Sequence, residues 1–250
     1  MTNSKLSVII PTLNEEDNIQ VLLSSIEEQT EKNHETIIVD GGSTDQTITI
    51  AEKFNSKILV KKGLREFPSR NSGVKVSSGD ILLFTCADVI FPSHLFDNIN
   101  QHFKDPELIA LTGPDIPQSS VLAGLEYGVY NVFRFIFGLF PGSNKRFSVS
   151  TNFLAVRKKA FEKTGGFISD INGDGLMGQR LLQMGKVKFS LNTTVIISPR
   201  RFYNMGLSKF NRHYLYVLEN FFPILSKTSF IKKLKTKSGA VHGKMHEKIF

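Results

Sequence analysis

The sequence has 250 residues, of which 40% are hydrophobic and 22% are charged, and these proportions exclude a chain that is disordered throughout. Cys86 is the only cysteine, so no intrachain disulfide can form, and we expect a reducing, cytoplasmic compartment. The net charge of +8 favours an anionic partner, but residues 227–250 hold seven lysines against one glutamate. Because the rest of the chain is nearly neutral, nucleic acid is not the partner that we expect.

The first half of the chain alternates apolar runs with helical patterns. Continuous apolar runs predict strands at 6–11, 36–39, 57–60, 80–85 and 107–112. Between them, apolar side chains recur at helical spacing at 19–26, 47–54 and 95–103, and a turn or short helix is predicted at 68–78. Asn14 and Ser43 are placed to cap the first two helices. This succession predicts an α/β fold with a mostly parallel sheet.

The second half begins with an apolar segment at 121–140, which is about long enough to span a membrane but carries Glu126 and Arg134. We therefore interpret it as an amphipathic helix that is buried or lies at an interface. The remaining pattern predicts a loop at 141–146, a strand at 147–157, helices from 159 and at 174–184, strands at 187–190 and 194–198, and an aromatic helix at 208–225. The lysine-rich end that follows is either solvated or held at an anionic membrane surface.

Polar residues follow three of the predicted strands directly. These strand ends read Pro11-Thr12-Leu13-Asn14-Glu15, Asp40-Gly41-Gly42-Ser43 and Cys86-Ala87-Asp88. Ligands of open parallel sheets bind outside the carboxyl ends of the strands, so we expect these residues to share one rim. The chain has neither a dinucleotide fingerprint nor a phosphate-binding loop, which disfavours a nicotinamide enzyme and a nucleoside triphosphatase.

Six segments in order resemble family 2 glycosyltransferases of the GT-A fold. Segments 8–16 (VIIPTLNEE), 37–45 (IIVDGGSTD) and 69–73 (SRNSG) are similar to the first three signatures of that family. Segment 82–88 (LLFTCAD) stands where the family has its Asp-x-Asp metal motif. Segment 165–174 resembles the acceptor-side block, and segment 198–201 (SPRR) resembles a basic motif of one bacterial and archaeal branch.

The resemblance implies a fold, a division of the chain and an activity. The fold would be a three-layer α/β/α sandwich, with residues 1–110 binding a nucleotide sugar and residues 111–206 forming the acceptor side of the same domain. Residues 207–250 would add a C-terminal aromatic helix and basic tail, with peripheral membrane contact left open. The activity would be a metal-dependent, inverting transfer from a nucleoside-diphosphate sugar, UDP-sugars favoured, to a lipid-linked or glycan acceptor.

The resemblance also implies roles for individual residues. Asp174 would be the catalytic base, and Asp88 would hold Mn²⁺ or Mg²⁺. Pro11, Thr12 and Glu15 would line the base and ribose pocket, Asp40 would bond the nucleobase, and Arg70, Arg200 and Arg201 would contact the diphosphate beside Asp88. Asn14, Gly41 and Gly42 are also expected to contact the sugar donor.

Two positions depart from the family pattern. Cys86 replaces the first aspartate of the metal motif, and a thiolate suits Mg²⁺ or Mn²⁺ poorly. Gly173 stands where the first acid of a Glu-Asp pair is usual. A non-catalytic protein that binds a sugar nucleotide or acts as a scaffold is therefore the alternative, and a basic nucleic-acid-binding protein is a second rival. Each aspartate also has a plainer interpretation as a turn or helix-cap residue.

Overall fold

The computed structural model describes residues 4–139, 149–169, 173–200 and 203. Its strands are β1 (Leu6–Thr12), β2 (His34–Asp40), β3 (Ser56–Val60), β4 (Ile81–Phe84), β5 (Val89–Ile90), β6 (Leu108–Thr112), β7 (Asp115–Pro117), β8 (Leu154–Arg157), β9 (Lys186–Phe189) and β10 (Val195–Ile197). Its helices are α1 (Ile19–Glu27), α2 (Thr47–Ala51), α3 (Glu66–Val76), α4 (Leu95–His102), α5 (Val121–Leu139), α6 (Lys158–Lys163), α7 (Gly173–Met184) and the 3₁₀ turn η1 (Leu191–Thr193).

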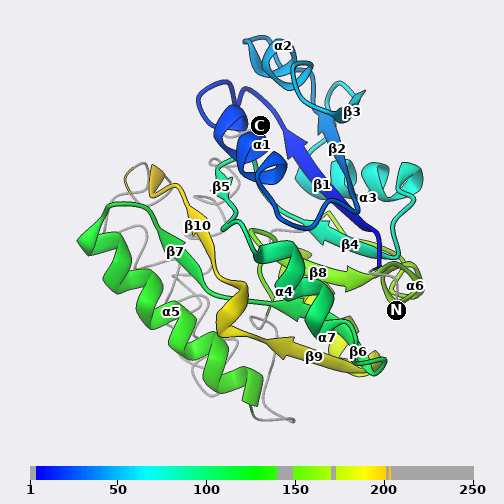
Figure 1. The fold of residues 1–250 in the computed structure, drawn as a ribbon, viewed down its shortest axis with the longest axis vertical. Coiled ribbons are helices and arrows are strands. Elements are labelled where there is room, and N and C mark those ends of the chain that lie inside the picture. The colour runs from blue at the N-terminus through cyan, green and yellow to red at the C-terminus, as the bar shows by residue number, and fades with distance from the viewer. Residues whose placement is uncertain (1–3, 140–148, 170–172, 201–202, 204–250) are drawn as a thin grey trace, which may run out of the picture.

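A seven-stranded sheet forms the centre, in the order β3-β2-β1-β4-β8-β6-β9 (Figure 1). Strands β3, β2, β1 and β4 are parallel, and β9 is parallel to β6. Strand β8 is antiparallel to both of its neighbours, β4 and β6. The predicted α/β class and the mostly parallel sheet are confirmed, and β8 is the strand that departs from a doubly wound pattern.

Both faces of this sheet are covered by apolar side chains. Val8 and Ile10 of β1 belong to a core that includes buried residues of α1 and α4. Ile9 points to the other face and joins a core with buried residues of α3, α6 and α7. Because successive side chains of a strand alternate between faces, a fully apolar strand such as β1 requires helices on both sides. The result is the three-layer arrangement that the sequence predicts.

A smaller sheet, β5-β10-β7, lies beside the main one (Figure 1). Strand β10 pairs antiparallel with β5, with Ile197 opposite Val89, and parallel with β7. The sequence does not predict β5 or β7, because strands of two and three residues carry too little periodicity to be recognised. This sheet brings the chain after β10 next to the residues that follow β4.

Helix α5 packs one side against the small sheet and β9 and leaves the other side open. Arg134, counted from the sequence as a cost to membrane insertion, is fully buried and forms an ion pair of 3.3 Å with Asp115 of β7. Leu122, Leu125 and Val129 are exposed along the opposite side. Among the described residues, no helix is long and apolar enough to cross a membrane.

Several local predictions are wrong. Asn14 and Ser43 do not cap helices: α1 begins after Asn18 and α2 after Gln46, neither with a side-chain cap. The strand predicted at 147–157 is shorter, since its described part is β8 with a bridge between Ser150 and Phe153. The predicted loop at 141–146, the helix at 208–225 and the basic tail lie outside the described residues.

Candidate active site

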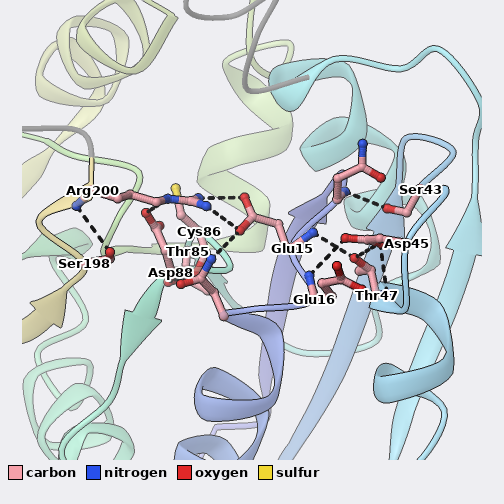
Figure 2. A network of polar contacts seen from close by, with 12 residues as sticks. Glu15, Glu16, Ser43, Asp45, Thr47, Thr85, Cys86, Asp88, Ser198 and Arg200 are labelled. Atoms are coloured by element: carbon pink, nitrogen blue, oxygen red, sulfur yellow. Dashed lines mark hydrogen bonds and ion pairs between the residues drawn. The ribbon is translucent and has the colours of Figure 1, made fainter. Parts of the chain in front are cut away.

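The loops after β1 and β2 are tied together by a set of hydrogen bonds at one edge of the sheet (Figure 2). The backbone N–H groups of Asn14 and Glu15 donate to Ser43 Oγ and Thr47 Oγ1 at 2.9 and 2.8 Å. In return, Asn14 Oδ1 accepts from the N–H of Thr44 at 2.9 Å. Asn14 also has a positive φ of 54°, which fits a tight turn better than a helix cap. The two strand ends therefore form one rigid rim, as predicted.

Asp40 is fully buried at the end of β2 and holds the following turn. Its Oδ1 accepts the backbone N–H groups of Gly42 at 2.8 Å and Ser43 at 2.7 Å. Its Oδ2 accepts from the hydroxyls of Thr12, at 3.0 Å, and Ser43. Each carboxylate oxygen thus already has two donors from this chain. The contact between Asp40 and a nucleobase stays a prediction. A nucleobase would have to bond the Asp40 carboxylate alongside the donors that it already has.

Two glycines make the turn after Asp40 possible. The N–H of Gly41 donates to Thr12 O at 2.8 Å, and a Cβ on Gly41 would lie 2.9 Å from Leu64 O. Gly42 has a φ of +105°, a conformation that side-chain-bearing residues rarely adopt. Pro11, also buried, pairs with Val39 within the sheet just before this point.

Glu15, Arg200 and Asp88 form an ion triad across the rim (Figure 2). The Nη1 and Nη2 atoms of Arg200 donate to Glu15 Oε2 and Oε1 at 2.8 and 2.7 Å, which is a bidentate pair. Its Nε donates to Asp88 Oδ2 at 2.8 Å. The N–H of Ser198 donates to Asp88 O at 2.9 Å, so the small sheet itself positions Arg200 beside Asp88.

Burial and charge act in opposite directions within this triad. Burial raises the pKa of the Glu15 carboxyl, and the negative charge of Asp88 adds to that rise, while Arg200 lowers the pKa. For Arg200, burial lowers the pKa, but the hydrogen bond to Glu15 and the charge of Asp88 outweigh burial and raise it. The guanidinium is therefore firmly charged, and it neutralises carboxylates that would otherwise repel each other.

The triad also shows how a divalent cation would fit. Carboxylate oxygens are the ligands that Mg²⁺ and Mn²⁺ prefer, and Asp88 and Glu15 present them on either side of a positive charge. Among the described residues, no three His, Cys, Asp or Glu side chains converge on one point. One or two carboxylates with phosphate and water as further ligands is a usual arrangement for Mg²⁺. The donor set fits a cation that is bound together with a diphosphate.

Arg70, expected at the diphosphate, lies inside the protein. Its side chain has no exposed surface, and it donates to Thr85 O and Glu66 Oε1 at 2.6 Å each. It also approaches Cys86 Sγ at 3.3 Å. A diphosphate would reach the guanidinium only if these neighbours moved. The diphosphate contact of Arg70 therefore stays a prediction. The sequence analysis missed Glu66 as a partner of Arg70, although its position four residues earlier on the same helix is the spacing of such a pair.

Asp174 lies in the first turn of α7, where it is half-buried. Its Oδ1 accepts from the N–H of Gly175 at 2.8 Å. Tyr130 of α5 lies close enough that the charge of Asp174 contributes to raising the pKa of the phenol, which burial raises most. Arg201, the second predicted arginine, lies outside the described residues.

With this geometry established, comparison with known proteins identifies the family. A family model described as glycosyl transferase family 2 matches residues 7–165, more than half of the chain. The chain belongs to this family. The matched range contains every predicted site residue of this family 2 glycosyltransferase except Asp174, Arg200 and Arg201.

Relatives and a solved structure agree with the family. The chain is 34% identical over 130 residues to the poly(ribitol-phosphate) beta-N-acetylglucosaminyltransferase TarS of Staphylococcus aureus (strain Mu50), covering 46% of this chain and 23% of TarS. It is 25% identical over 205 residues to the O-antigen chain rhamnosyltransferase RfbN of Salmonella typhimurium, covering 76% of this chain and 65% of RfbN. The chain thus spans from about a quarter to about two thirds of these relatives. The mannosyltransferase PcManGT from Pyrobaculum calidifontis was solved in complex with GDP-Man and Mn²⁺. Its structure matches this chain with a TM-score of 0.69 at 20% identity and covers 95% of this chain and 70% of PcManGT. The two proteins share the GT-A fold.

The two departures from the family pattern have local explanations. A Cβ on Gly173 would lie 2.6 Å from Phe67 Cε2 and 2.7 Å from Ile168 O, so a larger residue would not fit without displacing them. Cys86 is half-buried, and its Sγ lies 3.8 Å from Thr151 O in addition to its contact with Arg70. Both positions of this glycosyltransferase are therefore used for packing at the edges of the site.

Proposed function

We propose that this protein is an inverting, metal-dependent glycosyltransferase that uses a nucleoside-diphosphate sugar. The observation that carries the proposal is the pair of carboxylates, Glu15 and Asp88, which both bond the Arg200 guanidinium at the strand ends of a family 2 chain. UDP-sugars are favoured by the family resemblance, and a GDP-sugar is the second choice because PcManGT was solved with GDP-Man and Mn²⁺.

The chain's own residues divide the work of the transfer. Glu15, beside the turn at Gly41 and Gly42, would line the pocket for the base and ribose. Asp88 would hold Mn²⁺ or Mg²⁺, which when bound neutralises the charge of the leaving diphosphate. Arg200 lies within reach of the same place, and Arg201 follows it in sequence.

Asp174 completes the proposed reaction as general base. The acceptor hydroxyl attacks the anomeric carbon while the bond to the diphosphate breaks, and the hydroxyl proton passes to the Asp174 carboxylate. A single displacement of this kind inverts the configuration at the sugar. The place of Asp174 in the first turn of α7 favours the ionised carboxylate that a base requires. An acceptor phosphate in place of a hydroxyl would remove the need for this base.

The acceptor and the surface that presents it are proposed from α5 and the C-terminal end. The names of TarS and RfbN refer to a poly(ribitol-phosphate) and to an O-antigen chain, which supports a lipid-linked or glycan acceptor here. Leu122, Leu125 and Val129 form an apolar stripe that is 57–66% exposed. Tyr203 Oη donates to Ser120 Oγ at 2.9 Å, so the chain passes the start of this stripe before its lysine-rich end. An apolar stripe, in a chain that also has a lysine-rich segment, fits an anionic membrane surface at the cytoplasmic side.

One assay tests the central proposal. Release of nucleoside diphosphate from UDP-GlcNAc and GDP-mannose is measured with Mn²⁺ for the unaltered chain, Asp88→Ala, Asp174→Asn and the surface control Asp105→Asn. We expect turnover that both site substitutions reduce by about 10²-fold or more and the control leaves unchanged. Nucleotide binding without turnover under any of these conditions would instead support the non-catalytic alternative.

Vesicle sedimentation tests the membrane part separately. Vesicles with and without anionic lipid are mixed with the unaltered chain, with Leu125→Glu and with a control, Val60→Glu, whose exposed residue lies on β3 away from the stripe. We expect salt-sensitive sedimentation with anionic vesicles that Leu125→Glu alone weakens. No sedimentation at low salt would reject the membrane contact and leave the transferase proposal standing.

A further inference from the structure

Arg200 occupies a position between two carboxylates that come from distant parts of the chain. Glu15 precedes α1, and Asp88 follows β4, and all three polar atoms of the guanidinium are used in bonds of 2.7–2.8 Å. The Glu15 side chain is 9% exposed and that of Asp88 is 19% exposed. Little water reaches these charges, so a cation is required between them when no ligand is bound.

The backbone near Arg200 is held independently of its side chain. The N–H of Ser198 bonds Asp88 O, and β10 continues the pairing with β5 through Ile197 and Val89. The side chain of Arg200 is 35% exposed. The guanidinium can therefore leave Asp88 by rotation of its own side chain, without separating the strands that carry it.

We infer that Arg200 is the resident counter-cation of Asp88, which the carboxylate exchanges for a divalent metal when a nucleoside diphosphate enters. The inference rests on the proposed function for the identity of the ligands. The metal alone must compete with a positive charge that already neutralises Asp88. The diphosphate changes this balance because its oxygens can accept from the guanidinium N–H that Asp88 releases. Arg200 is thus a positioning residue that makes metal and diphosphate bind cooperatively.

The experiment measures Mn²⁺ binding directly. Free Mn²⁺ is followed by electron paramagnetic resonance in titrations of the full chain, first with Mn²⁺ alone and then with UDP or GDP present. Arg200→Gln removes the competing charge, and Arg200→Lys keeps a charge without the planar fork of the guanidinium. Lys186→Gln removes an exposed cation that forms an ion pair with Asp105. Circular dichroism confirms that each variant is folded.

The expected results differ between these variants. Arg200→Gln should bind Mn²⁺ alone at least about fivefold more tightly than the unaltered chain, with Arg200→Lys in between and Lys186→Gln unchanged. Adding Asp88→Asn to Arg200→Gln should abolish the gain, which shows that Asp88 is the carboxylate involved. The nucleotide should raise Mn²⁺ affinity much less in Arg200→Gln than in the unaltered chain.

Opposite results overturn the inference. If neither Arg200 variant binds Mn²⁺ more tightly than the unaltered chain, Arg200 does not compete with the metal, even where nucleotide binding and turnover are normal. If Arg200→Gln gains affinity for Mn²⁺ but neither UDP nor GDP binds any variant, the competition stands and the proposed function fails. The two proposals therefore fall on different observations.

Discussion

Arg70 offers the sharpest test of how this site is built, because two predictions compete for it. The family resemblance expects it at the diphosphate, whereas its fully buried guanidinium bonds Thr85 O, Glu66 Oε1 and Cys86 Sγ. The perturbation is Arg70→Met, which keeps much of the volume and removes the charge. We expect the effect to fall on the fold of the site and not on the affinity for a nucleotide.

The magnitude follows from the burial of the pair. Removing one partner of a buried ion pair costs about 3–5 kcal/mol, because the other charge is left without compensation. The Glu66 side chain is 12% exposed, so water relieves little of this cost. For a chain of this length, such a loss lowers the melting temperature by roughly 6–20 °C. Adding Glu66→Gln to Arg70→Met should recover part of the loss, since the uncompensated carboxylate is then gone.

The assay combines unfolding with binding. Because the chain has no tryptophan, urea unfolding is followed by far-ultraviolet circular dichroism, and UDP or GDP binding is measured by calorimetry below the melting temperature of the variant. We expect nucleotide affinity of the folded variant to stay within about twofold of the unaltered chain, since no bond to the ligand is lost. A stability loss under about 1 kcal/mol together with a tenfold or greater loss of affinity would refute this reasoning and place Arg70 at the diphosphate.

Three further substitutions test the surrounding fold. Burial alone would raise the pKa of Glu35, but hydrogen bonds from Ser7 and Ser78 lower it from 4.5 to about 2. The ionised form of Glu35 therefore stabilises the fold above about pH 4.5, and that contribution disappears as the pH falls towards 2. Glu35→Gln should therefore cost about 1–2 kcal/mol in urea unfolding at pH 7 and almost nothing near pH 2, and an equal cost at both would contradict the assignment. Gly42→Ala should cost about 1–2 kcal/mol from its φ of +105°, and no loss would show that the turn can relax. Gly124→Ala should instead raise the free energy of unfolding by about 0.5–1 kcal/mol, since its helix leaves open space for a Cβ, and a destabilised variant would disagree with that packing.

The sequence was sufficient to place the strand ends, but not the contacts between them. Apolar runs located β1, β2 and β4, and the rule for parallel sheets then brought Glu15, Asp40 and Asp88 to one rim. The bond between Arg200 and Asp88 spans 112 positions and depends on strands of two and three residues. The sequence predicts a strand at 194–198 but not the two-residue strand β5, so only the folded chain shows their pairing.

The wrong helix caps have a related cause. Asn14 and Ser43 have the side chains that caps favour, and capping rules consider only the residues that follow in sequence. In the structure, both side chains bond a neighbouring loop or strand end: Asn14 Oδ1 accepts from Thr44, and Ser43 Oγ donates to Asp40. Tertiary partners compete with local ones for the same polar atoms, and at this rim the tertiary partners prevail.

The three carboxylates of the rim differ in how readily each can take a ligand. Asp40 accepts hydrogen bonds from N–H groups and hydroxyls of its own turn and of β1, and these donors cannot move away without disrupting the fold. Asp88 and Glu15 instead bond the long side chain of Arg200, which can rotate away, and Glu15 also accepts from Asn18 Nδ2 at 3.0 Å. A buried charge needs a partner at all times. A carboxylate that binds a metal ion only while substrate is present therefore needs another positive group beside it when the metal is absent. Of the two carboxylates that bond Arg200, we therefore propose the exchange for a metal at Asp88, whereas the hydrogen bonds of Asp40 hold the turn after β2.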